Sequence, residues 1–135
     1  MLEKAVIWCR SETGNKEDLA RQKQVLSLFC QESGFEVIRS YSEYGKADNL
    51  KLQIFRQMAI YKEFDKLIIE NLDIFGFSPD EVTEEVKFLN AHGIQVLSME
   101  EGELTKDTLP DLFRKRIKVI VCNPKMKWKR YRRTN

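Results

Sequence analysis

The stretch Ala5-Val6-Ile7-Trp8-Cys9, close to the amino terminus, is apolar at every position and includes two β-branched residues. A run of this kind predicts a strand buried on both faces, as strands of parallel sheets are. Similar short runs recur along the chain, and each is typical of a strand. They predict four further strands, at residues 35–38, 66–70, 94–97 and 118–122.

Segments with apolar residues at helical spacing separate these runs. The clearest helix start is Ser78-Pro79-Asp80-Glu81, in which Ser78 suits the cap, Pro79 the first helical position and Glu81 the capping box. Asn15 and Asp18 are suited to begin an earlier helix, which Gly34 would end. The expected helices lie between Asn15 and Gly34, over residues 50–64, from Pro79 to Gly93, and over residues 110–115.

Strands that alternate with helices of this length form βαβ units. We therefore expect an α/β fold, a three-layer sandwich with a mostly parallel sheet of four to five strands flanked by helices. One domain should occupy residues 1–123, because 135 residues suffice for one hydrophobic core. A basic C-terminal tail should follow at residues 124–135.

The charges are distributed unevenly. Residues 114–135 hold ten of the 23 Lys and Arg residues and no Asp or Glu, which leaves residues 1–113 with 13 basic and 21 acidic residues, a net charge of −8. No apolar stretch is long enough to span a membrane, and no signal peptide precedes the first strand, so we expect a cytoplasmic protein without a membrane partner.

Cysteine and histidine give no sign of a metal site or a cofactor. Cys9, Cys30 and Cys122 lack the spacing of metal or redox motifs and are expected to be buried thiols. His92 precedes Gly93 at an expected helix end, where it would interact with the helix dipole rather than with a metal. The sequence also lacks the glycine-rich phosphate and dinucleotide motifs, so we expect no cofactor.

Two strand ends carry polar residues that suit phosphate chemistry. In an open α/β sheet, ligands bind beyond the carboxyl ends of the strands. One end delivers Arg10-Ser11-Glu12-Thr13 and another delivers Glu70-Asn71-Leu72-Asp73. Arginine would bind a phosphate and a hydroxyl would be the nucleophile. The alternative interpretation is that Ser11, Thr13 and Asn15 turn the chain and cap the helix, and that Asp73 caps a loop.

Several segments together resemble, in order, the catalytic domain of the resolvase/invertase family of serine recombinases. The resemblance covers about residues 4–102 and implies the fold of that domain and a link to DNA recombination. The segments that carry it are Trp8-Cys9-Arg10, the helix with Leu19 and Gln22, Tyr41-Ser42-Glu43-Tyr44-Gly45, the run from Leu67 to Asp73, and the run from Gly93 to Ser98.

The chain departs from the family at the residues that perform the chemistry. The family pattern aromatic-x-Arg-Val-Ser-Thr reads Trp8-Cys9-Arg10-Ser11-Glu12-Thr13, so Glu12 stands at the position of the nucleophilic serine. Ser11 is one residue early, and one step along a strand turns a side chain to the other face.

Basic residues of the family are also replaced. The pattern Leu-Asp-Arg-Leu-x-Arg keeps Asp73 but has Ile74 and Phe77 at the two arginines, and Lys51 stands where a third arginine is expected. Losing one such group costs about 10² to 10³ in rate. The family continues into a long dimerising helix and a DNA-binding module, for which residues 105–135 are too few, so its dimer cannot be assumed.

The tail combines six positive charges with two aromatic residues, a composition suited to neutralising phosphates and stacking on bases. It offers no code for reading a base sequence. A solubilising segment that docks on the acidic body, or attachment to a membrane surface, are the alternatives. The residues expected to contact DNA are Lys125, Lys127, Trp128, Lys129, Arg130, Tyr131, Arg132 and Arg133.

Three functions follow from these observations. The first is a DNA-associated protein of serine recombinase type, degenerate for strand exchange, whose protein partner would be a second copy or a recombinase. The second is a site-specific recombinase that is catalytically active. It would form a phosphoserine-type linkage through a shifted Ser11 or Thr13, and Arg10 and Asp73 would support this nucleophile. The third is a protein-interaction module that does not bind DNA.

Overall fold

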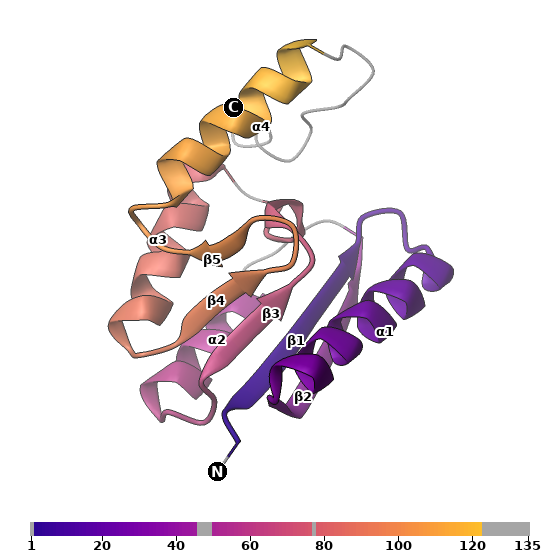
Figure 1. Cartoon of the computed structure of the whole chain (residues 1–135), viewed down its shortest axis with the longest axis vertical. Coiled ribbons are helices and arrows are strands. Elements are labelled where there is room, and N and C mark those ends of the chain that lie inside the picture. Colours follow the sequence, from indigo (N-terminus) through magenta and orange to yellow (C-terminus); the bar gives the residue numbers. More distant parts are fainter. Residues whose placement is uncertain (1, 46–49, 77, 123–135) are drawn as a thin grey trace.

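The computed structural model describes residues 2–45, 50–76 and 78–122, with the backbone alone at residue 50 and at residues 116–122. Its elements alternate between strands and helices, as the hydrophobic pattern predicts (Figure 1). They are β1 (Lys4–Ser11), α1 (Lys16–Ser33), β2 (Glu36–Tyr44), α2 (Leu50–Ile60), β3 (Lys66–Ile69), the 3-10 helix η1 (Leu72–Ile74), α3 (Pro79–Ala91), β4 (Gln95–Ser98), β5 (Gly102–Leu104) and α4 (Leu109–Cys122).

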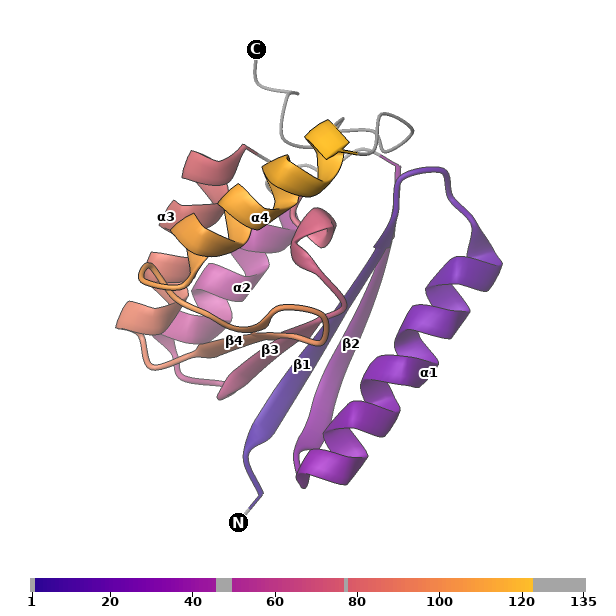
Figure 2. The same cartoon turned by 45° about the horizontal axis from the view of Figure 1, so that its top comes forward.

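The strands form one sheet in the order β2-β1-β3-β4-β5. The pairs β1/β2, β1/β3 and β3/β4 are parallel, and only β5 runs antiparallel to its neighbour β4. Helix α1 covers one face of the sheet, whereas α2, α3 and α4 lie on the other (Figure 2). The expected α/β sandwich with a mostly parallel sheet is therefore confirmed.

Alternation along β1 divides the core between these two faces. Val6 and Trp8 pack with residues of α2, α3 and α4 in the larger cluster. Ala5, Ile7 and Cys9 point the other way and pack against α1. Because β1 lies inside the sheet and is covered on both faces, its residues 5–9 are all apolar and show no alternation.

The helix boundaries follow the predicted capping residues. The Asn15 side chain accepts a hydrogen bond from the amide of Asp18 at the start of α1, and Gly34 ends that helix with a φ of 78°. At α3, Ser78 Oγ accepts from the amide of Glu81 at 3.4 Å and donates to its carboxylate at 3.1 Å. Both helices therefore begin at residues that satisfy their unpaired amides.

Two sequence-based expectations were wrong at the carboxyl-terminal end. Residues 118–122, predicted as the fifth strand, are the last turns of α4, of which the helix expected at residues 110–115 is the first part. A short β-branched run fits a strand and a helix equally, and here the helix already begun at Leu109 continues through it. The fifth strand is instead β5, in a segment where no strand was expected.

The second strand is longer than its apolar run suggested. The prediction covered residues 35–38, but β2 continues to Tyr44. It lies at the edge of the sheet and most of its residues are exposed or half-buried. An edge strand tolerates polar residues such as Ser40 and Ser42, so its second half carries no hydrophobic signal.

Candidate functional site

The carboxyl ends of β1 and β3 lie side by side at one edge of the sheet and bring Arg10 next to η1. The Arg10 side chain is only 2% exposed. Its Nε donates to the carbonyl of Ile74 at 2.7 Å, Nη1 to that of Gly45 at 2.9 Å and Nη2 to that of Asp73 at 3.4 Å. The guanidinium therefore links the end of β1 to the segment after β2 and to the segment after β3.

Gly45 contributes to this arrangement through its backbone. Its φ is 76°, a conformation that side chains rarely adopt, and its amide donates to the carbonyl of Ser11 at 3.0 Å. Its own carbonyl faces Arg10. The turn after β2 is thus bonded to the end of β1 through both backbone groups of one glycine.

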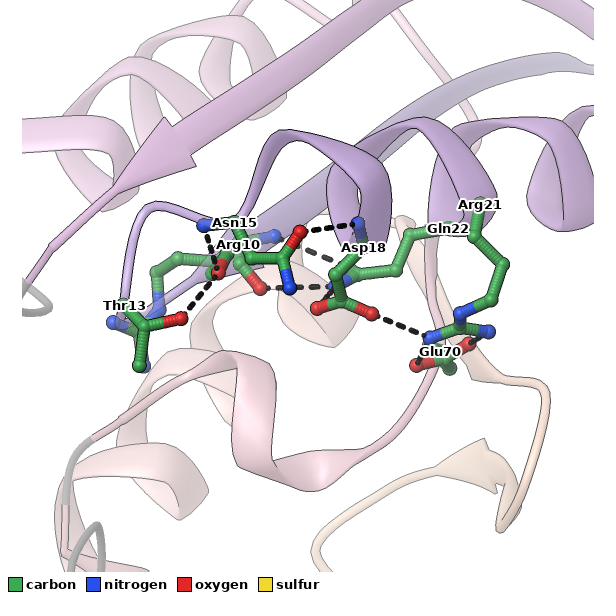
Figure 3. Close-up of polar contacts among 8 residues, drawn as sticks. Arg10, Thr13, Asn15, Asp18, Arg21, Gln22 and Glu70 are labelled. Atoms are coloured by element: carbon green, nitrogen blue, oxygen red, sulfur yellow. Dashed lines mark hydrogen bonds and ion pairs between the residues drawn. The ribbon is translucent and has the colours of Figure 1, made fainter.

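The backbone of Arg10 is held from the opposite side of the sheet by Gln22 of α1. The Arg10 amide donates to Gln22 Oε1 at 3.2 Å, and Gln22 Nε2 donates to the Arg10 carbonyl at 3.1 Å (Figure 3). Gln22 Nε2 also donates to the Asp18 carboxylate at 2.9 Å. The Gln22 side chain is 2% exposed, so its carboxamide replaces a missing strand neighbour for Arg10.

Ser11 belongs to the α1 side of the sheet. Alternation places its side chain on the face of Cys9, opposite to that of Arg10. Its Oγ accepts a hydrogen bond from the Asn15 amide at 3.0 Å and lies 3.4 Å from Thr13 Oγ1, and the residue is 4% exposed. Ser11 therefore holds the turn that leads into α1, and Thr13, which is exposed, lies in the same turn (Figure 3).

The candidate residues fall into two separate pairs. Arg10 meets the backbone of Asp73, and Ser11 meets Thr13, but the two pairs bond to different sides of the sheet edge. Asp73 is half-buried, and its amide donates to Asn71 Oδ1 at 3.0 Å. Asn71, rather than Asp73, is the residue that caps η1.

Two of the three positions that hold arginine in the resembled family, Ile74 and Lys51, lie within the described residues. Ile74 is 3% exposed and belongs to the larger core cluster. Lys51 Nζ lies 4.4 Å from the centre of the Tyr41 ring, where the π-face attracts its charge. Glu12 is half-buried at the end of β1. Phe77 and the predicted DNA contacts at residues 125–133 lie outside the described residues.

Carboxylates are prominent at this edge, and the sequence reasoning did not single out several of them. Glu70 accepts two hydrogen bonds from Arg21, at 2.7 and 3.0 Å, which raise the pKa of that guanidinium (Figure 3). Glu43 accepts from Nε1 of the buried Trp8. Glu101 accepts from the Leu72 amide at 3.1 Å, and burial raises its pKa. Their partners are distant in sequence, so no local pattern identifies them.

The remaining candidates for chemistry are engaged within the fold. His92 caps the end of α3, with Nδ1 2.9 Å from the Phe88 carbonyl. Cys9 and Cys30 are buried, and burial raises the pKa of each thiol to about 11. In the described ranges, no group of three or more His, Cys, Asp or Glu residues is placed to hold a metal. No helix in these ranges is long and apolar enough to cross a membrane.

Solved structures of an integrase domain and of a site-specific recombinase have a similar fold. The N-terminal catalytic domain of TP901-1 integrase is 22% identical, with 87% of this chain and 93% of that chain covered and a TM-score of 0.69. A resolvase family site-specific recombinase from Streptococcus pneumoniae is 15% identical, with 90% and 95% covered and a TM-score of 0.69. At these identities the likeness shows that the chain shares their fold.

A family model identifies the chain more closely. Residues 5–121 match the model described as "Resolvase, N terminal domain". The protein therefore belongs to the resolvase family, and the match extends through α4, beyond the roughly 4–102 expected from the motifs. No curated protein matches the chain at a significant level.

Proposed function

We propose that this protein is a DNA-associated member of the resolvase family that does not exchange strands by the family mechanism. The observation that carries the proposal is the bonding of Arg10. Its guanidinium donates to three backbone oxygens and is buried, so binding a phosphate would require it to give up part of this arrangement. Uncompensated loss of such bonds is costly in a buried site.

The residues around Arg10 support the same conclusion. The side chain in the nucleophile register is Glu12, whose negative charge would repel a phosphodiester. Ser11, the nearest hydroxyl, is bonded to the start of α1. Ile74 is in the core where an arginine would have stabilised the transition-state charge.

DNA binding would then depend on positive charges away from the edge of the sheet that holds Arg10. The tail offers six cations between Lys125 and Arg133, with Trp128 and Tyr131 among them. Six neutralised phosphates of duplex DNA correspond to a slope of about −5 in a plot of log K against log salt. Such binding would tolerate any base sequence, because phosphate contacts carry no sequence information.

Fluorescence anisotropy with a labelled duplex at several salt concentrations tests the DNA connection. We expect the full chain to bind with a steep salt dependence and residues 1–123 to lose nearly all affinity. A full chain in which Trp128 and Tyr131 are replaced by alanine separates charge from stacking and should keep the slope. Equal binding by residues 1–123 and the full chain would contradict a role for the tail.

A suicide DNA substrate, which traps covalent intermediates, tests the loss of strand exchange. We expect no protein–DNA adduct that survives denaturation. An adduct that disappears in Ser11→Ala or in Thr13→Ala would show that the shifted nucleophile is active, and would overturn this part of the proposal. Because trapping and anisotropy are measured separately, DNA association and loss of chemistry can fail independently.

A further inference from the structure

An apolar groove lies on α2 where it meets α3, away from the edge that holds Arg10. Its volume is about 630 Å³, and its apolar lining consists of Ile54, Met58, Ile60 and Phe88. Ile60 is 53% exposed. We call this feature the α2–α3 groove. Apolar surface gathered in a groove is typical of binding sites rather than of ordinary solvent-facing helices.

An acidic depression of about 450 Å³ continues the α2–α3 groove toward the start of α3. The two share Gln53 and Arg56 in their linings, so they form one continuous surface. The carboxylates in the depression are those of Asp80, Glu81, Glu84 and Glu85.

Arg56 is the one cation among the described residues of these linings, and it does not neutralise their carboxylates. Arg56 donates to both carboxylate oxygens of Glu85, at 2.6 and 3.0 Å, and lies 4.5 Å over the Phe88 ring. Its charge is thereby matched by one carboxylate. Glu84 has a lysine partner, Lys87, at 3.6 Å, but both side chains are largely exposed and such pairs are weak. The described residues that line the depression therefore carry a net negative charge.

This combination of shape and charge selects one kind of occupant. Two helices that border an apolar groove accommodate the apolar stripe of a third helix. The eleven residues of α2 span about 16 Å, which matches roughly three turns of such a ligand. Its flank over the depression must be basic to complement the carboxylates, and the same carboxylates would repel nucleic acid.

We propose that the α2–α3 groove binds a basic amphipathic helix of a partner protein. Apolar side chains one turn apart would contact Ile54, Ile60 and Phe88, while Lys or Arg residues on the adjoining flank would approach Asp80 and Glu84. This proposal does not rest on the proposed DNA association, because its evidence comes from neither residues 124–135 nor the end of β1.

Calorimetric titration of the full chain tests this inference. The probe is a synthetic peptide of about 14 residues, roughly four helical turns, with leucine at helical spacing and lysine elsewhere. A second peptide with glutamate in place of lysine is the control for charge. We expect the leucine–lysine peptide to bind one to one, and the leucine–glutamate peptide to bind at least about tenfold more weakly.

Matched variants locate the site. Ile60→Asp should weaken binding of the leucine–lysine peptide by about tenfold or more, whereas Leu28→Asp should not, although both residues are 53% exposed. Glu84→Lys should weaken binding severalfold, and Glu32→Lys on α1 should leave it unchanged. Circular dichroism verifies that each variant folds. Because Glu84 is exposed, Glu84→Lys still tests the site if Ile60→Asp fails to fold.

Three outcomes would overturn the inference. The first is equal binding of the two peptides, and the second is an equal effect of each groove variant and its α1 control. The third is a dimer in sedimentation that Ile60→Asp converts to a monomer, which would show that a second copy of this chain occupies the groove.

Discussion

Arg10 has a structural role in this chain, because its guanidinium donates hydrogen bonds to three backbone carbonyls. A charged group that is 2% exposed must have its donors satisfied, and three backbone carbonyls from two other segments do so. These segments lie 35 and 63 to 64 residues away in sequence, so Arg10 connects parts of the chain that no local structure joins.

Replacing Arg10 should therefore destabilise the fold. Arg10→Leu keeps an apolar side chain at the position but leaves the carbonyls of Ile74 and Gly45 without this donor. We expect a loss of about 2–4 kcal/mol in the free energy of unfolding, measured by urea titration. Arg39→Leu, at an exposed position of β2, is the control and should change stability by less than about 0.5 kcal/mol. Similar small effects of both would show that Arg10 does not hold the sheet edge together.

At the scale of elements, the turn between β4 and β5 is attached to η1 through Glu101. Its carboxylate accepts from the Leu72 amide at 3.1 Å and from the Ser98 hydroxyl, and its amide donates to Ser98 Oγ at 3.2 Å. Burial raises the pKa of Glu101, and Glu100 and Asp73 raise it further, whereas its two hydrogen bonds lower it. The net shift of the pKa is upward, so folding disfavours the charged form of this carboxyl relative to the unfolded chain.

The raised pKa of Glu101 predicts that the stability of the fold depends on pH. Because the folded pKa is the higher one, the contribution of Glu101 to stability is complete below its unfolded pKa of about 4.3 and is lost as pH rises through the folded value. Glu101→Gln stays neutral at every pH. We expect the stability of this variant, relative to the unmodified protein, to increase between pH 4 and pH 7 in urea titrations. A difference that does not vary with pH would contradict the assignment.

Individual elements differ in how far their sequences predict them. The apolar run of β1 and the capping residues Asn15 and Ser78 led to correct elements, because burial on both faces and amide capping leave local signals. Residues 118–122 were predicted as a strand and lie in α4. Their β-branched composition favours a strand only when a neighbouring strand is available for pairing, and no local pattern contains that information.

At the scale of the whole molecule, α4 closes the larger half of the core. Leu109 is fully buried in that cluster, together with Phe113, and both come from the first turns of the helix. The rest of the cluster comes from the strands, η1, α2, α3 and the segments between them, and α4 lies on the same face of the sheet as α2 and α3 (Figure 2).

Truncating Leu109 tests this role. Leu109→Ala leaves a cavity in the larger core, and we expect a loss of about 2–5 kcal/mol in the free energy of unfolding. Leu112→Ala, one turn along the same helix at a half-buried position, is the matched control and should cost clearly less. Urea titration followed by tryptophan fluorescence reports both values, because Trp8 lies in this cluster. Equal losses of stability in the two variants would show that the burial of Leu109 is not what attaches α4 to the core.

The sequence by itself determined the α/β class, most of the strand and helix positions, the likeness to serine recombinases and the residues that depart from the family pattern. These depend on local periodicity, capping and motif order, all of which are carried by neighbouring residues. Only the tertiary structure decided that β5 rather than residues 118–122 is the fifth strand, and which backbone carbonyls accept hydrogen bonds from the Arg10 guanidinium. The acceptors of Arg10 lie 35 to 64 residues away in sequence and are set by how distant segments pack, and that information is not local.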